Sequence, residues 1–141
     1  MANDFTKKEG ATIVKQVELK TMVIKLRSDG IMQFDFKPCD EYTIHDLKET
    51  NMAADILGEG EIFPRLIFIK HFIRFDKDIR MYGATEESNT TTAAAAFVVN
   101  LIALKFVGNF YISFNKPVRP TRLFDSEKAA VEWLKTFMIK N

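Results

Sequence analysis

Ser113 and Lys116 stand three residues apart, the spacing at which a lysine one helical turn away can help to deprotonate a serine nucleophile. Penicillin-binding enzymes use this S-x-x-K pattern together with S-D-N and K-T-G motifs. The sequence contains neither companion motif, and Pro117 follows the lysine directly. We therefore interpret residues 113–116 as the end of a helix that leads into a loop, and we predict no catalytic residue.

The side chains that most often bind metals or act as nucleophiles are few. His45 and His71 are the only histidines, and no H-x-x-x-H or C-x-x-C spacing accompanies them. Cys39 has no basic neighbour that would lower the pKa of its thiol. Gly58 and Gly60 precede a predicted strand rather than a helix, so they do not form a phosphate-binding loop. We predict no metal site and no cofactor.

A polar and basic set of side chains surrounds a loop that is stiffened by Pro117 and Pro120. Its members are Asn109, Asn115, Lys116, Arg119 and Arg122, and Lys77 and Arg80 join them if the helix before the loop lies close. One hypothesis is that this set binds an anionic ligand or an acidic partner. The other is structural, because asparagines often satisfy loop backbone groups and loop cations are usually solvated.

The strands that would position these residues follow from apolar patterning. Residues 20–36 alternate on both sides of Asp29-Gly30, a dipeptide that predicts a hairpin of two antiparallel strands. The apolar run RLIFI after Pro64 is typical of a strand buried on both faces. We predict two further strands, at residues 93–98 and 121–124.

Four helices are predicted between and after these strands. Thr43 can cap a helix that begins at Ile44 and ends at Gly58, with Lys48, Glu49 and Asp55 in solvent, and Asp76 can cap a helix that runs to about Glu87. Residues 101–114 fit a third helix. Asp125 or Ser126 caps a final helix, whose buried stripe is Ala130, Trp133, Leu134 and Phe137.

The predicted order β-β-α-β-α-β-α-β-α implies crossover connections, so the later strands should be parallel. We expect an α/β fold with a single-domain mixed sheet and helices mainly on one face. Its length of 141 residues suits one domain, which we place at residues 20–141. Residues 1–19 are interpreted as a polar N-terminal extension that includes a candidate edge strand.

Composition narrows the partners. A net charge of +1 gives no long-range field for phosphate backbones, so we exclude nucleic acid. No apolar run is long enough to cross a membrane, the N-terminus lacks a signal-type apolar region, and the single cysteine cannot form an internal disulfide, so we expect a cytoplasmic protein. Thirteen phenylalanines predict a ring-filled core, with a Phe-lined pocket or a dimer face as the alternative.

Several of these motifs occur together in a known order: the SDGI hairpin, a buried strand before an Asp-capped helix, and VGNFYISFNKPVRPTRLF followed by AAVEWLK. In this combination the chain resembles bacterial STAS-type domains similar to the sporulation anti-anti-sigma factor, in particular their small, free-standing, uncharacterised members. The resemblance covers about residue 20 to the C-terminus. It implies a mixed sheet, and partner or ligand binding rather than catalysis.

One feature of the regulatory members is missing. In those proteins an Asp followed by a phosphorylatable serine opens the second helix, and the added phosphate switches partner binding. Here Asp76 matches the cap, but Lys77 stands where the hydroxyl would be. We therefore expect this chain to lack the phospho-serine switch.

Two hypotheses about function remain. The first is a non-catalytic interaction domain that forms a homodimer or binds a protein partner, with a small apolar or anionic ligand as a further candidate. The second is a small enzyme or cofactor-dependent protein whose site is assembled in space or across a dimer interface. A contiguous exposed apolar patch would favour association, whereas a closed pocket with converging polar groups would favour ligand chemistry.

Overall fold

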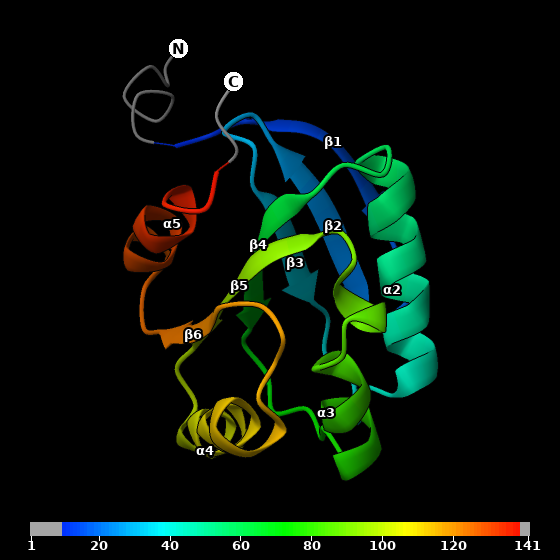
Figure 1. The fold of residues 1–141 in the computed structure, drawn as a ribbon, viewed down its shortest axis with the longest axis vertical. Helices are drawn as coiled ribbons and strands as arrows, with labels where there is room; N and C mark the ends of the chain where they lie inside the picture. Colours follow the sequence, from blue (N-terminus) through cyan, green and yellow to red (C-terminus); the bar gives the residue numbers. More distant parts are fainter. Residues whose placement is uncertain (1–9, 139–141) are drawn as a thin grey trace.

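A six-stranded mixed sheet forms the centre of the molecule, as a computed structural model that describes residues 10–138 shows (Figure 1). The strands lie side by side in the order in which they occur in the chain. β1 to β3 pair antiparallel, and β3 to β6 pair parallel. The strands are β1 (Ile13–Glu18), β2 (Met22–Arg27), β3 (Met32–Phe36), β4 (Phe63–Ile69), β5 (Thr92–Val99) and β6 (Thr121–Phe124).

The predicted hairpin is confirmed as β2 and β3. Gly30 has a φ of 85°, a conformation that glycine adopts at no steric cost. The Asp29 carboxylate fixes the turn, because it accepts hydrogen bonds from the Ile31 amide (3.3 Å) and the Arg27 guanidinium (2.9 Å). β1 adds one more antiparallel strand at the sheet edge, so the sheet begins before residue 20, whereas residues 1–9 of the predicted extension lie outside the described part of the chain.

The connections between parallel strands explain where the helices lie. α2 (Ile44–Leu57), α3 (Lys77–Gly83) and α4 (Ile102–Phe110) each link one parallel strand to its next neighbour. Right-handed crossovers that all advance in one direction must place their helices on one face of the sheet. α5 (Glu127–Lys135) follows the last strand and packs on the opposite face (Figure 1). The predicted α/β fold with helices mainly on one face is confirmed.

Alternation along the strands gives the sheet two apolar faces. Under α5, the buried side chains are small on β5, where Ala94 and Ala96 allow close packing of Ala130 and Leu134. On the other face, Ile24 and Phe34 pack beneath α2, α3 and α4. The core that the sequence predicted is therefore split by the sheet into two clusters.

The helix caps agree with the sequence in two of three cases. Thr43 forms a capping box with Asp46, whose carboxylate accepts from the Thr43 amide at 2.9 Å. Ser126 caps α5 by accepting from the Ala129 amide at 3.3 Å. Asp76 occupies the cap position of α3, but its side chain makes no cap hydrogen bond and pairs instead with Arg74 at 3.3 Å.

One predicted helix ends early, and another has the predicted extent but a π-helical last turn. α3 ends at Gly83 rather than about Glu87, because the side-chain Nδ2 of Asn89 donates to the carbonyls of Gly83 (2.8 Å) and Thr85 (2.7 Å) and closes the helix early. A short 3-10 turn, η1 (Glu87–Asn89), follows. α4 continues beyond Phe110 as a π-helical turn, η2 (Tyr111–Asn115), which stops at Lys116 with a left-handed φ of 52°.

Candidate functional site

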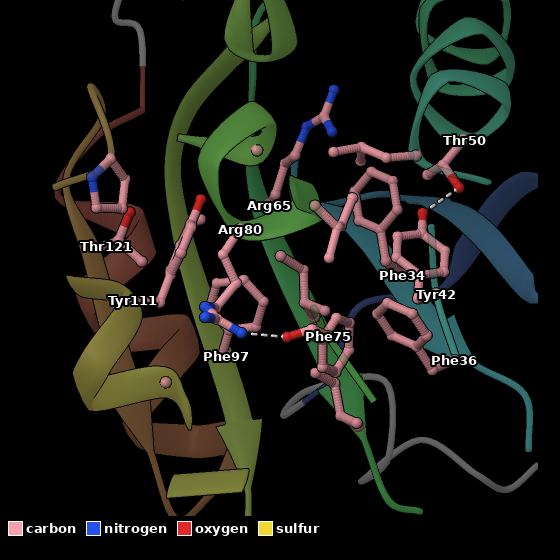
Figure 2. A pocket seen from close by; sticks show the side chains of 18 of the residues that line it. Phe34, Phe36, Tyr42, Thr50, Arg65, Phe75, Arg80, Phe97, Tyr111 and Thr121 are labelled. Atoms are coloured by element: carbon pink, nitrogen blue, oxygen red, sulfur yellow. Dashed lines mark hydrogen bonds between the residues drawn. The ribbon is translucent and has the colours of Figure 1, made fainter. Parts of the chain in front are cut away.

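A cavity of about 160 Å³ lies between the helix-covered face of the sheet and α2, α3 and α4 (Figure 2). Its floor comes from alternate residues of β2 to β6, and its roof comes from the three helices and η2. Most of its lining is apolar. It is a largely apolar pocket with a few polar groups on its wall, partly open to solvent, and in these features it fits a ligand-binding interpretation of the sequence.

Aromatic rings form much of the wall. Phe36, Tyr42 and Phe75 meet edge to face, with centroids 4.8 to 6.0 Å apart, and Phe97 meets Tyr111 in the same way at 6.4 Å. Such arrangements are favourable for rings because the positive edge of one faces the negative face of another. Because the rings pack on one another as well as on the cavity, they give it a stiff wall.

Small residues explain why space remains there. Ala95 lies on the sheet face that α3 and α4 cover, and Gly83 and Gly108 face the cavity from these helices. A Cβ atom at Gly108 would come within 2.9 Å of both Leu123 methyl groups, so α4 packs directly on β6 at this point. Without larger side chains at Ala95 and Gly83, the packed layers leave an unfilled volume between them.

Arg65 brings a buried positive charge to the cavity wall. Its guanidinium donates to Asn51 Oδ1 (2.9 Å) and Thr91 Oγ1 (3.1 Å), and it stacks 4.9 Å from the Phe34 ring centre. Thr91 in turn donates to Asp55 Oδ1 (2.7 Å). Burial lowers the pKa of Arg65 to about 10, so the group stays charged at neutral pH. Asp55, which we predicted to lie in solvent, instead ends a relay of hydrogen bonds that runs from Arg65 through Thr91.

Arg80 brings a second positive charge, from the last turn of α3. One terminal nitrogen, Nη1, donates to the Phe75 carbonyl, and the guanidinium lies 5.3 Å from the Phe110 ring centre. Its Nε is buried and has no protein partner. Figure 2 shows the Arg80 guanidinium in the wall beside Phe97 and Phe75. Arg80 therefore has hydrogen-bonding capacity that the fold leaves unused.

Two hydroxyl groups on the wall are also available. Thr92 Oγ1 is buried without a protein partner. Burial raises the pKa of Tyr111 to about 12, so its hydroxyl remains a neutral donor at neutral pH. By contrast, the Tyr42 hydroxyl is already paired with Thr50 Oγ1 at 2.5 Å, and its pKa is raised well above the ordinary range, mainly by burial.

The electrostatic character of the cavity is one-sided. Its described lining includes Arg65 and Arg80 but no aspartate or glutamate. Within residues 10–138, no carboxylate oxygen lies within 4 Å of either guanidinium. This arrangement favours an acceptor or a negative charge in the cavity.

The structure disperses most of the polar set that the sequence singled out. Of that set, Arg80 lines the cavity. Arg119 binds Glu86 through two nitrogens at 2.7 Å and donates to the Thr92 carbonyl at 2.9 Å, and Arg122 lies over the Phe124 and Trp133 rings of the α5 side. Asn115 is half-buried. The exposed members are Lys77, Asn109 and Lys116.

The other chemically interesting side chains stay apart. His45 is exposed on α2, where it lies 3.5 Å from Glu49, and His71 is exposed after β4. Burial raises the pKa of Cys39. Among residues 10–138, no three histidine, cysteine or acidic side chains are grouped so that they could hold a metal ion. Ser113 is exposed in η2, and neither it nor Lys116 lines the cavity.

Sequence reasoning missed Arg65, Tyr111 and Thr92 as wall residues. One signal was present for Arg65: a charge at the start of a continuous apolar strand must be buried with partners. The sequence carried no such signal for Tyr111 or Thr92. Their position depends on how η2 folds over the sheet and on a register shift between β4 and β5 at Phe63 and Pro64.

A second apolar feature lies on the outside of the molecule. We define the α4 stripe as Ile102, Phe106, Phe110 and Phe114, whose exposed fractions are 75%, 74%, 44% and 71%. Two of its rings, Phe110 and Phe114, stack 4.5 Å apart. α4 and η2 are thus apolar on both sides, since Leu104, Val107 and Tyr111 face the cavity. Only the inner side of residues 101–114 therefore contributes to the core.

The sheet order, the three helices on one face and the fourth on the other define a STAS-like α/β fold. A family model described as "Domain of unknown function (DUF7793)" matches residues 24–138, and the chain belongs to this family. A search of the curated proteins finds no match.

One of the solved structures with a similar fold is an uncharacterised protein of the DUF3478 family from Shewanella loihica PV-4, with a SpoIIAA-like fold. The two chains align with a TM-score of 0.54 at 12% identity, over 89% of this chain and 93% of that one. At this identity the likeness establishes the fold. No helix in residues 10–138 is long and apolar enough to span a membrane.

Proposed function

We propose that this chain is a non-catalytic, STAS-type domain that binds a small, largely apolar ligand in the cavity between its sheet and α3 and α4. The observation that carries the proposal is the cavity itself: it is lined mostly by aromatic and aliphatic side chains and has polar groups without protein partners at Arg80 and Thr92. Apolar pockets with a few convergent polar groups are the usual form of small-molecule sites.

The volume of the cavity limits the ligand. An engineered protein cavity of about 150 Å³ binds benzene, whereas drug-sized pockets measure roughly 300–1,000 Å³. A cavity of about 160 Å³ therefore suits one ring or a short acyl chain. Larger molecules would require α4 and η2 to move away from the sheet.

Toluene titration followed by methyl NMR tests this proposal. We expect saturable shifts of the methyl signals of Ile67, Ile69 and Leu104, which line the cavity. Ala95→Phe places a ring in the space and should abolish these shifts, while Ile56→Ala, on the exposed side of α2, should leave them unchanged. If toluene perturbs no cavity methyl in the wild type, or if Ala95→Phe binds as well as the wild type, the proposal is wrong.

We propose in addition that the chain self-associates as a homodimer through the α4 stripe. Contiguous exposed apolar side chains on one helix support this role, and a net charge of +1 presents little repulsion between two copies. Sedimentation equilibrium should give a dimer for the wild type and a monomer for Phe106→Ser. Ile56→Ser, equally exposed on α2, should stay dimeric. A wild-type protein that stays monomeric at a concentration of about 100 μM would contradict the proposal.

We also propose that this chain shares partner binding with the anti-anti-sigma factors but not their phosphate switch. Lys77 follows the cap position Asp76, so we infer that any protein partner binds without a phosphate switch at this point. The single cysteine and the STAS-like fold support a cytoplasmic, bacterial protein. A partner that binds only after phosphorylation in residues 76–78 would contradict this inference.

The alternative is an enzyme whose site is assembled in space or across a dimer interface. It would need a nucleophile and a base in contact. The described lining of the cavity contains no histidine, lysine, cysteine or carboxylate, which supports binding rather than catalysis as the proposal. Turnover of a bound carboxylic acid or ester by the purified protein would favour the enzyme.

A further inference from the structure

We infer that the ligand of the cavity is a small carboxylic acid, bound as the carboxylate by Arg80 with its apolar body among the rings of the wall. This inference rests on the proposed function, and it adds the chemical class of the ligand. It follows from the hydrogen-bonding state of Arg80, from the charge balance of the cavity and from the shape of the apolar wall.

The hydrogen bonds of Arg80 leave one edge of its guanidinium without a protein partner among the described residues. Nη1 is occupied by the Phe75 carbonyl, which together with the Phe110 ring holds the group in place. Nε is buried and without a protein partner. Nε and the other terminal nitrogen form the edge of the guanidinium that can bind a carboxylate through two parallel hydrogen bonds. Carboxylate geometry therefore matches what the fold leaves unused.

Arg65 does not compete for this role. Both of its terminal nitrogens are already bound, to Asn51 and to Thr91. It contributes positive potential to the same cavity, whose described lining contains no acidic side chain. Asp55 already offsets part of the charge of Arg65 through Thr91, whereas no carboxylate contacts the half-buried Arg80 within residues 10–138, so an anion that enters the cavity gains mainly from Arg80.

The apolar wall determines what the rest of the ligand, beyond its carboxylate, can be. Phe97 and Phe75 lie beside Arg80 (Figure 2), and Ile67, Val99 and Leu104 complete an apolar surround. Thr92 and Tyr111 add neutral hydroxyls on the wall, of which Thr92 Oγ1 has no protein partner. A molecule with a single ring or a short branched chain fits the volume, and its carboxylate reaches Arg80.

A matched pair of probes tests the inference by ¹⁹F NMR titration. 4-Fluorophenylacetate carries the carboxylate, and 4-fluorophenylacetamide has nearly the same shape without the charge. A charge-assisted hydrogen bond pair should make the acid bind about tenfold more tightly than the amide to the wild-type protein. Arg80→Met should weaken the acid about tenfold and change the amide by less than about twofold.

Lys77→Met is the control, because Lys77 is an exposed cation on the same helix and does not line the cavity. It should bind both probes as the wild type does. Equal affinity of the two probes for the wild type overturns the carboxylate inference and leaves the ligand-binding proposal intact. A preference for the acid that persists in Arg80→Met also overturns the inference, because Arg80 would then not bind the carboxylate. Failure of both probes to bind the wild type at millimolar concentration overturns the binding proposal itself. The wild-type comparison decides the matter even if Arg80→Met does not fold.

Discussion

The relay from Arg65 through Thr91 to Asp55 gives the sharpest stability prediction. Thr91→Val keeps the volume of the side chain but removes the hydroxyl that accepts from Arg65 at 3.1 Å and donates to Asp55 at 2.7 Å. Arg65 is buried, so the nitrogen that loses its partner cannot be fully solvated. We expect the variant to fold and to be less stable.

The magnitude follows from the charge. A hydrogen bond to a charged group contributes about 1.5–3 kcal/mol, and the hydrogen bond from Thr91 to the half-buried Asp55 contributes little, so we expect a loss of about 2 kcal/mol in the free energy of unfolding. For a domain of this size such a loss lowers the melting temperature by about 6–8 °C. Arg65→Met should remove most of the effect, because an apolar replacement for a buried ion leaves no unpaired charge.

Urea unfolding of a double-mutant cycle measures this. Thr91→Val should cost about 2 kcal/mol in the wild-type background and about 0.5 kcal/mol in the Arg65→Met background, a coupling of about 1.5 kcal/mol. The slope of the free energy against urea concentration should not change. If Thr91→Val costs the same in both backgrounds, the hydroxyl does not support the cation and the reasoning is refuted.

Two further predictions concern exposed positions. Lys116 has a left-handed φ of 52°, so Lys116→Gly should raise the free energy of unfolding by about 0.5–1 kcal/mol in urea titrations. Lys128→Gly, in helix α5, is the control and should lower the free energy of unfolding. An unchanged or lower value for Lys116→Gly would contradict the prediction. Arg119 holds the pKa of the Glu86 carboxyl below its ordinary value of 4.5, chiefly through their hydrogen bonds. This contribution is therefore present above pH 4.5 and is lost as the pH falls through the lower folded-state pKa. Stability measured from pH 7 to 3 should fall less steeply in Glu86→Gln, and equal slopes would show that the pair adds nothing.

Much of the fold was predictable because each element carries its own local signal. Asp29-Gly30 predicts the hairpin, Thr43 and Gly58 bracket α2, and Ser126 begins α5. These are backbone requirements that few residue types satisfy. The end of α3 was not predictable in this way, because Asn89 caps it from six residues beyond.

The candidate site was less accessible to sequence reasoning. Arg80 was among the predicted binding residues, but only on the condition that its helix lies close to the loop of Arg119 and Arg122. In the structure Arg122 lies over rings on the α5 side of the sheet and Arg119 pairs with Glu86, whereas Arg80 lies at the cavity with Arg65, 15 residues before it in the sequence. Cavities arise where small residues such as Ala95 pack against parts of the chain that are distant in sequence. An alanine in the sequence does not by itself indicate a cavity.

The phenylalanines occupy three kinds of position in the structure. Phe34 is buried in the core, Phe97 lines the cavity, and Phe106 and Phe114 are exposed on the α4 stripe. Both of the alternatives that the sequence left open, a pocket and an apolar surface, therefore have a physical counterpart. Which side of α4 a ring occupies depends on the helix phase, which Gly108 and its contact with Leu123 fix.

The location of a bound apolar molecule tests the central claim most directly. Crystals of the protein soaked with iodobenzene would show the halogen by its anomalous scattering. We expect a peak inside the cavity, between Phe97 on β5 and Leu104 on α4. Iodine found only on the α4 stripe, or nowhere in the molecule, would contradict the claim that this fold has a ligand site between its sheet and helices.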